Sequence, residues 1–297
     1  MTVRAHGSGL ATLGLLAVTA AWGSTFFLIK DLLDRIPVAD FLAVRFTIAA
    51  LALWLIAPKA VAQLSAIARR RAVLLGLVYG AGQLLQTAGL GHTSASVSGF
   101  VTGMYVVMTP LFAAGLVRAR VGASAWAAVV LATGGLALLS LQGFAVGLGE
   151  SLTLASAALY ALHIVALGAW STPREALGLS IVQLAVITVV CWAGALLGGV
   201  ELPTTGSDWL ATLYMALVAG AFALVVQTWA QAHMSATRAA IVMTMEPVFA
   251  AAFAVGWGGE DLSARMVGGG ALVLAAMYLA ELGPRRGRDA EVPHLVT

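Results

Sequence analysis

The chain has 297 residues, of which 61% are apolar and 10% are charged, and its mean hydropathy is +0.96. Soluble domains carry about 25% charged residues, so this composition excludes a soluble protein and indicates one that crosses a membrane many times. The formal net charge is +3, and the single cysteine, Cys191, excludes a framework of disulfides.

Ten apolar segments, each about as long as one bilayer crossing, follow one another along the chain. Their apolar residues are continuous rather than alternating, which favours α-helices over the strands of a membrane barrel. The predicted spans are 10–29, 39–57, 73–91, 96–117, 124–142, 150–170, 178–199, 209–230, 238–257 and 264–282. The longest polar pieces are the link 58–72 and the tail after Gly283. We therefore expect an all-α membrane protein of ten transmembrane helices.

The basic residues predict which ends of the spans face the cytoplasm. With the N-terminus inside, twelve Lys and Arg residues gather on one side, among them the run 69–71. The other side has three, which are Lys30, Arg35 and Arg265. An even number of spans then places both termini in the cytoplasm. The first span also has the pattern of a secretory signal, but nine further spans favour its retention as a helix.

The chain contains a weak internal repeat. The pattern glutamine, seven residues, Ser-Ala begins at Gln86 and again at Gln227, and a proline follows each, Pro110 or Pro247. Five crossings are an odd number, so two such halves would enter the membrane from opposite sides, as in the inverted repeats of secondary transporters. The expected units are a five-helix repeat at 1–145, an inverted five-helix repeat at 146–283 and a basic cytoplasmic tail at 284–297.

Polar and aromatic residues inside the spans are the candidate substrate contacts, because polar groups in a bilayer are costly and usually face the bundle interior. Tyr79, Gln83 and Gln86 share one helix face, which suits a carboxylate and an ammonium group. Deep aromatic rings could stack on an aromatic substrate or a cation. The cavity candidates are Trp22, Tyr79, Gln83, Gln86, Met104, Tyr105, Tyr160, His163 and Gln227. For each, the alternative is ordinary packing or hydrogen bonding between helices.

Glu246 and Pro247 lie inside the ninth span, in the stretch MTMEPVF. Glu246 is a candidate for proton coupling or cation binding, and the alternative is a structural acid beside the proline. Pro247 removes one backbone hydrogen bond, so the carbonyl of Met243 needs another partner. Pro110 and Pro247 are hinge candidates, and the hydroxyl of Thr109 could bond to the backbone near Pro110.

Arg45 lies one to two turns into the second span. We expect it to extend to the outer interface or to pair with Asp40, and binding of a substrate carboxylate is the alternative. The pattern Gly76-x-x-x-Gly80 predicts close approach of two helices.

Five stretches carry a family resemblance: WGSTFFLIK (22–30), FLAVRFTIAALAL (41–53), SASVSGFVTGMYVVMTPLF (94–112), AALYALHIVALG (157–168) and MEPVFAAAFAVGWGGEDLS (245–263). They resemble the drug/metabolite transporter superfamily, EamA type, over essentially the whole chain. This implies a ten-helix exporter of a bacterial-type inner (plasma) membrane with a central cavity. Similarity to YddG-like exporters implies amino acids as substrates, aromatic ones especially, and organic cations such as methyl viologen. The first half departs by having Thr109 where the second has Glu246.

No motif for enzyme chemistry is present in the sequence. It has no P-loop for ATP, no His, Cys and Asp cluster with metal-ligand spacing, and no serine with a plausible His and Asp partner set. We expect a secondary transporter that needs no cofactor or metal, whose partners are a small-molecule substrate and the lipid bilayer, without nucleic acid or a protein partner. The alternatives are a membrane-embedded enzyme that modifies a lipid or sugar-lipid, and a passive channel or scaffold.

Overall fold

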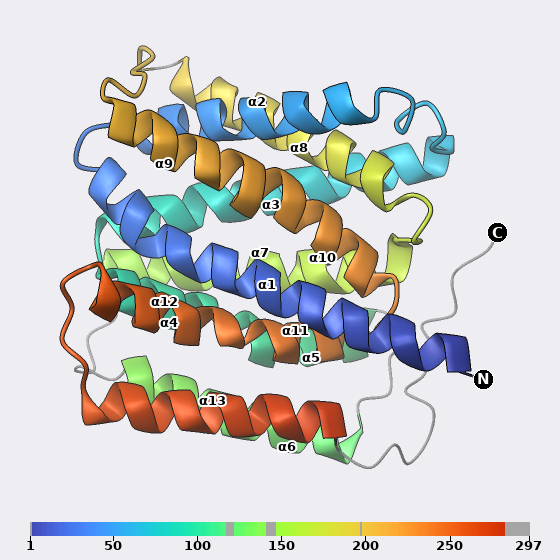
Figure 1. Cartoon of the computed structure of the whole chain (residues 1–297), viewed down its shortest axis with the longest axis vertical. Helices are drawn as coiled ribbons and strands as arrows, with labels where there is room; N and C mark the ends of the chain where they lie inside the picture. Colours follow the sequence, from blue (N-terminus) through green and yellow to red (C-terminus); the bar gives the residue numbers. More distant parts are fainter. Residues whose placement is uncertain (1, 117–121, 141–146, 197, 283–297) are drawn as a thin grey trace.

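The computed structural model of the chain describes residues 2–116, 122–140, 147–196 and 198–282. In these residues thirteen α-helices and one π-helical stretch form ten rods that run side by side in one bundle (Figure 1). Eight rods are long and apolar enough to cross a membrane, and two shorter apolar helices, Ala123–Gly135 and Ala264–Leu279, accompany them. The described residues contain no strand, so the all-α prediction is confirmed.

The rods follow the ten predicted apolar segments in chain order. They are α1 (Thr2–Leu32), α2 (Val38–Ile56), α3 (Ala66–Gly91), α4 (Ala95–Thr102) with α5 (Tyr105–Leu116), α6 (Ala123–Ser140), α7 (Leu148–Trp170), α8 (Ala176–Ala195), α9 (Gly206–Ala216) with α10 (Ala223–Gln231), α11 (Ala236–Met243) with α12 (Met245–Gly256), and α13 (Ala264–Leu282). The start of α1 and the end of α13 lie at the same end of the bundle, as an even number of rods requires (Figure 1). Arg118, Arg120 and the tail 284–297, which contribute to the basic side, lie outside the described residues.

The third rod begins earlier than expected, so the predicted polar link 58–72 is wrong. Ser65 is its N-cap and accepts a hydrogen bond from the backbone N–H of Ala68. The three arginines at 69–71 therefore lie in the first turns of α3. Arginine is a good helix former, and its long stem can lie along apolar surface. The guanidinium of Arg71 lies 5.7 Å from the ring centre of Trp170.

Two rods are interrupted in the same way. In each, an eight-residue helix is followed by a twelve-residue helix: α4 with α5, and α11 with α12. Ser94 and Ser235 cap the two short helices, and the interruptions lie nine residues later, at Gly103 (103 − 94) and Thr244 (244 − 235). Both interruptions precede the prolines.

The two prolines occupy different places in the helices that follow the interruptions. Pro247 is the third residue of α12 (247 − 245 + 1), where a helix has no use for the N–H that proline lacks. Pro110 lies further inside α5. The positions of the two breaks therefore do not follow from the positions of the prolines alone.

The rod from α9 to α10 contains a π-helical stretch, Leu217–Phe222. A π-helix inserts extra residues into the i→i−4 hydrogen-bond ladder and leaves carbonyls that other donors can reach. The sequence predicted an uninterrupted helix here. This stretch packs against α1 and α2.

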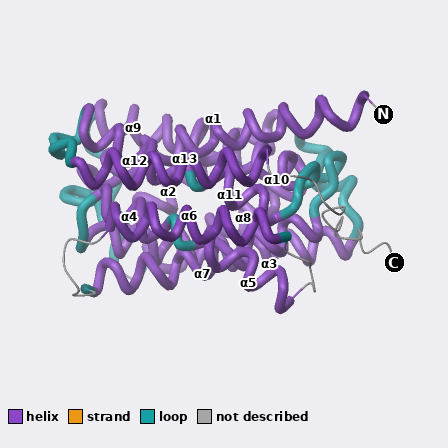
Figure 2. Tube along the Cα trace, turned by 90° about the horizontal axis from the view of Figure 1, so that it is seen from below, coloured by secondary structure: helices purple, strands orange, loops and turns teal. Residues whose placement is uncertain are grey.

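The long helix α3 packs against both α7 and α8, whereas α6 and α13 pair with each other along one side of the bundle (Figures 1 and 2). A Cβ placed on Gly76 would lie 2.8 Å from the Cβ of Val186 and 2.9 Å from the carbonyl oxygen of Gln183. Glycine is therefore needed where α3 meets α8, which confirms the predicted close approach.

Polar contacts link several rods at the end of the bundle where α1 and α3 end. Lys30 donates to the carbonyl of Leu90 in the last turn of α3 (3.1 Å) and to that of Thr93 just after α3 (2.8 Å). The Thr93 hydroxyl donates to Glu150 of α7 at 2.7 Å, and the Ser96 hydroxyl of α4 donates to Glu260, between α12 and α13. We call these contacts the end cluster.

Arg35 links the turn after α1 to the start of α9. Its Nη2 atom donates to Asp31 at 2.6 Å and to Asp208 at 2.8 Å. The hydrogen bonds to Asp31 and, to a smaller extent, to Asp208 raise the pKa of Arg35 above its ordinary value. The guanidinium of Arg35 is therefore positively charged at physiological pH.

Candidate functional site

A cavity lies in the middle of the bundle. The space between its lining side chains, including the opening to the outside, is about 570 Å³. Residues of both sequence halves border it, on α1, α2, α3, α5, α7, α10, α11 and α12. The lining extends along α1 from Trp22 to Ile29 and along α3 from Tyr79 to Leu90. The cavity thus runs from the middle of the bundle toward the end cluster.

Most residues predicted as cavity contacts border this one space, although they come from six helices. The structure brings together Trp22, Tyr79, Gln83, Gln86, Tyr105, Tyr160, His163, Gln227 and Glu246. Met104 is not among the lining residues. It lies at the interruption between α4 and α5 and packs against the cluster of Phe100 and Ala251.

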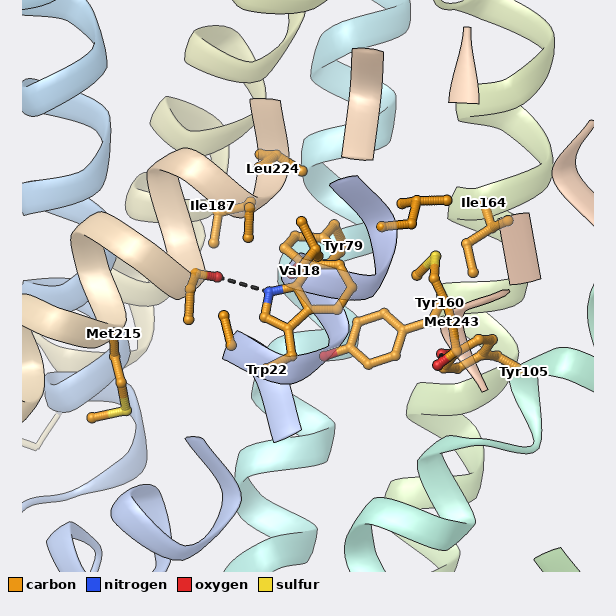
Figure 3. Packing of buried hydrophobic residues seen from close by; sticks show 14 of the residues in the cluster. Val18, Trp22, Tyr79, Tyr105, Tyr160, Ile164, Ile187, Met215, Leu224 and Met243 are labelled. Carbon is orange, nitrogen blue, oxygen red and sulfur yellow. Dashed lines mark hydrogen bonds between the residues drawn. The ribbon is translucent and has the colours of Figure 1, made fainter. Parts of the chain in front are cut away.

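The π stretch supplies hydrogen-bond acceptors to two cavity residues. The indole Nε1 of Trp22 donates to the carbonyl of Ala219 at 2.8 Å (Figure 3). Arg45 donates from Nε to the carbonyl of Met215 at 3.1 Å and from Nη2 to that of Ala219 at 3.5 Å. The irregular backbone therefore fixes both side chains at the cavity wall.

Arg45 lies inside the bundle, with 3% of its surface exposed, and it lines the cavity. The expectation that it extends to the interface or pairs with Asp40 is wrong, because Asp40 instead accepts a hydrogen bond from the backbone N–H of Glu201 at 2.8 Å. The presence of an arginine within a span was itself a sequence signal for this interior position, because a charge within a span usually faces the bundle interior.

A chain of hydrogen bonds joins α3, α7 and α4 beside the cavity. The amide of Gln83 donates to the Tyr160 hydroxyl (2.7 Å), which donates to the amide oxygen of Gln86 (2.8 Å). Gln86 in turn donates to the Thr102 hydroxyl at 3.0 Å. Gly82 makes room for this arrangement, since a Cβ there would lie 2.7 Å from Cε1 of Tyr160. The two glutamines thus hold the phenol of Tyr160 in one orientation.

Aromatic rings are gathered on the same wall. The ring centre of Tyr79 lies 5.5 Å from that of Tyr160 and 4.9 Å from that of His163, distances typical of favourable aromatic pairs. Nε2 of His163 is 2.8 Å from the amide oxygen of Gln183 on α8. His163 therefore borders the cavity and also bonds to a neighbouring helix, the two alternatives that the sequence left open for it.

Tyr105 contacts the backbone beside Pro247. Its hydroxyl donates to the carbonyl of Met243 at 2.7 Å and lies 3.2 Å from a carboxylate oxygen of Glu246. Met243 carries the carbonyl that the proline was predicted to leave free, so the need for another partner is confirmed (Figure 3). The analogous suggestion for Thr109 is wrong, because its buried hydroxyl has no hydrogen-bond partner among the described residues.

An arginine, an acid and an unpaired amide oxygen complete the site. Arg45 and Glu246 border the same cavity as Tyr79 and Tyr160, yet they form no ion pair with each other in the described chain. The Oε1 atom of Gln227 is buried and has no hydrogen-bond partner in the same residues. The cavity therefore offers a cation, an acid and a free acceptor around a pair of phenol rings.

Comparisons with known proteins bear on the family and the fold of the chain. The family model of the EamA-like transporter family matches residues 9–141 and again residues 147–282. A protein of Archaeoglobus fulgidus, described as an uncharacterized transporter, is 28% identical over 273 residues, which are 92% of this chain and 86% of the relative. A crystal structure of a protein that is 18% identical has a TM-score of 0.76, covers 94% of this chain and 98% of its own, and is similar in fold.

Proposed function

Since the chain belongs to the EamA-like transporter family, we propose that it exports amino acids, aromatic ones especially, through the central cavity. Family membership makes it a multi-pass membrane transporter and not an enzyme, so the alternative of a lipid-modifying enzyme is set aside. The observation that supports the proposed substrates is the composition of the cavity wall. Aromatic rings lie beside one cation and one acid that do not neutralise each other.

The proposed mechanism is alternating access between two inverted five-helix repeats, 1–145 and 146–283. The interrupted rods support it, because a capped eight-residue helix, a break and a second helix recur in each half. The breaks near Gly103 and Thr244, with Pro110 and Pro247 after them, are the proposed hinges. The cavity would then be exposed first to one face of the membrane and later to the other.

The proposed membrane is a bacterial-type inner membrane, with both termini in the cytoplasm. This orientation follows the excess of basic residues on one side. The end cluster then faces outward, and the cavity extends toward that outer face. We also propose that the chain is similar to YddG-like exporters and that it transports organic cations such as methyl viologen.

Glu246 has two proposed roles that one variant separates. A coupling role requires the carboxylate to exchange a proton or cation with the cavity, whereas a structural role requires only its place beside Pro247 and Tyr105. Glu246→Gln keeps the shape and removes the charge. Loss of uphill export with intact counterflow supports coupling, and full uphill export with unchanged pH dependence supports the structural role.

Counterflow in liposomes tests the proposed function directly. The purified protein is reconstituted into vesicles loaded with unlabelled amino acid, and uptake of labelled phenylalanine, tryptophan, alanine, glutamate and methyl viologen is compared. We expect transient accumulation of the aromatic amino acids. Trp257→Phe is the matched control, because Trp257 is 74% exposed on the outside of the bundle. Absence of flux for every amino acid and cation in the panel would contradict the proposal.

A further inference from the structure

Arg45 carries a charge in the interior of the bundle that no acid of the described chain neutralises. Its side chain is 3% exposed and borders the cavity, and the ion pairs of the described residues involve Arg35 instead. An unpaired buried charge is costly in a membrane protein, and such residues usually mark a path for substrates or ions.

The hydrogen bonds of Arg45 leave one side of its guanidinium free. A guanidinium has five N–H donors. The described residues provide acceptors for two of them, the carbonyl of Met215 for Nε and the carbonyl of Ala219 for Nη2. Both hydrogens on Nη1 and the second hydrogen on Nη2 remain. These donors form the end-on pair that binds a carboxylate through two parallel hydrogen bonds.

The surroundings of Arg45 hold that free side in place. The carbonyl of Ala219 also accepts from Trp22, so the π stretch fixes the two side chains together. The guanidinium carbon lies 5.0 Å from the ring centre of Phe46. A positioned donor pair is a better binding group than a mobile one, because less side-chain entropy is lost when the ligand binds.

Groups suited to an ammonium border the same cavity. Glu246 is a carboxylate without a cationic partner in the described residues, and Oε1 of Gln227 is a buried acceptor without a donor. The paired rings of Tyr79 and Tyr160 border the same cavity as Arg45 and Glu246.

We propose that Arg45 binds the carboxylate of the transported molecule, so that the cavity selects zwitterions with a free carboxylate over cations that lack one. The proposal rests on the proposed function and narrows its substrate class. An amine or dication without a carboxylate would enter a low-dielectric space beside the positive charge of Arg45, and repulsion would oppose its binding. The organic cations of the broader proposal are then poor substrates.

A series of phenylalanine analogues tests this in the reconstituted full-length protein. Phenylalaninamide and phenylethylamine keep the ring and the amine but lack the carboxylate, and each competes with labelled phenylalanine in counterflow. We expect both to compete about tenfold or more weakly than phenylalanine, the factor typical of losing a charged hydrogen-bond pair. In Arg45→Gln this preference should fall to near unity, chiefly through weaker binding of phenylalanine.

Arg70→Gln is the matched control, because it makes the same substitution at an exposed arginine of α3, and it should keep the wild-type preference. Arg45→Lys keeps the charge without the planar pair of donors, so an intermediate preference is expected. If Arg45→Gln does not elute as a folded monodisperse protein, the test is the rise in melting temperature that each of the three ligands causes in the wild type. Phenylalanine is expected to cause the largest rise.

The outcomes separate the two proposals. A wild type that transports phenylalanine and phenylethylamine equally well, or is stabilised equally by them, overturns the role of Arg45 and leaves the proposed function intact. A folded Arg45→Gln that retains the tenfold preference does the same. A wild type that moves none of the ligands overturns the proposed function, and the inference with it.

Discussion

At the scale of single residues, Tyr105 shows how one hydroxyl compensates for a proline in a distant helix. Pro247 cannot donate a hydrogen bond to the carbonyl of Met243, and Tyr105, which is 138 positions away in sequence, donates to that carbonyl at 2.7 Å. A hydroxyl has one hydrogen, so the shorter contact to Met243 is its main hydrogen bond and the 3.2 Å contact to Glu246 is secondary. The phenol therefore joins α5 to the break between α11 and α12.

Tyr105→Phe should destabilise the protein by about 1–3 kcal/mol, because the buried carbonyl of Met243 loses its partner. The measurement is thermal unfolding of the purified protein in detergent. Tyr278→Phe is the matched control, since Tyr278 on α13 is 68% exposed and its loss of a hydroxyl should change little. Equal melting temperatures for the two variants would show that another group can serve Met243.

At the scale of the elements, the π stretch Leu217–Phe222 connects backbone geometry to the site. The carbonyls of Met215, near the end of α9, and of Ala219, inside the stretch, accept hydrogen bonds from Arg45 and Trp22 on two other rods. In a regular α-helix these carbonyls would accept from the N–H groups four residues later. The irregular stretch is therefore what allows a buried arginine to be held without an acidic partner.

Deletion of Val218 should convert the π stretch into regular α-helix, because a π-bulge amounts to an inserted residue. Arg45 and Trp22 would lose their acceptors, so we expect a folded protein whose phenylalanine counterflow is abolished. Val218 is 38% exposed, so the deletion removes little packing. Circular dichroism and size-exclusion chromatography report folding, and liposome counterflow reports activity.

A deletion in a regular helix provides the comparison. Removal of Val189, which is 70% exposed on α8, turns the rest of that helix by about 100° and should prevent folding. Wild-type counterflow in the Val218 deletion would show that the site does not depend on the π stretch.

At the scale of the whole molecule, the end cluster connects several rods at the end of the bundle toward which the cavity extends. Lys30 on α1 contacts the turn after α3, and that turn contacts Glu150 on α7. Ser96 on α4 contacts Glu260, which precedes α13. The proposed alternating access requires rods to move relative to one another, so it predicts that contacts of this kind break and re-form during transport.

Linking Ser96→Cys to Glu260→Cys should therefore hold the protein in one state. The two substitutions are made in a Cys191→Ala background, because Cys191 is the one native cysteine. A short bifunctional thiol reagent with a reducible linker is expected to abolish counterflow, and reduction should restore it. Each single-cysteine variant with the same reagent is the control. Undiminished counterflow in the fully linked protein would show that this contact is static.

Much of the architecture followed from the sequence because it depends on local composition and period. Continuous apolar runs predicted ten helical rods, and the helical spacing of Tyr79, Gln83 and Gln86 predicted one shared face. The start of α3 was misplaced, since a hydropathy pattern does not register a capped helix that begins with basic residues. Apolar composition and helical spacing are properties of a single segment, and packing against neighbouring rods changes them little.

Which side chains meet was decided by the tertiary structure. Arg45 looked like an interfacial residue from its place in α2, and only the carbonyls of Met215 and Ala219 on a distant rod explain its interior position. Met104 is the neighbour of Tyr105 in sequence but packs against the cluster of Phe100 and Ala251. The sequence by itself determined a helical membrane protein with polar residues inside its spans, because burial in lipid constrains every segment alike. The tertiary structure decided which of these residues share a cavity, because hydrogen-bond acceptors and packing space come from other helices.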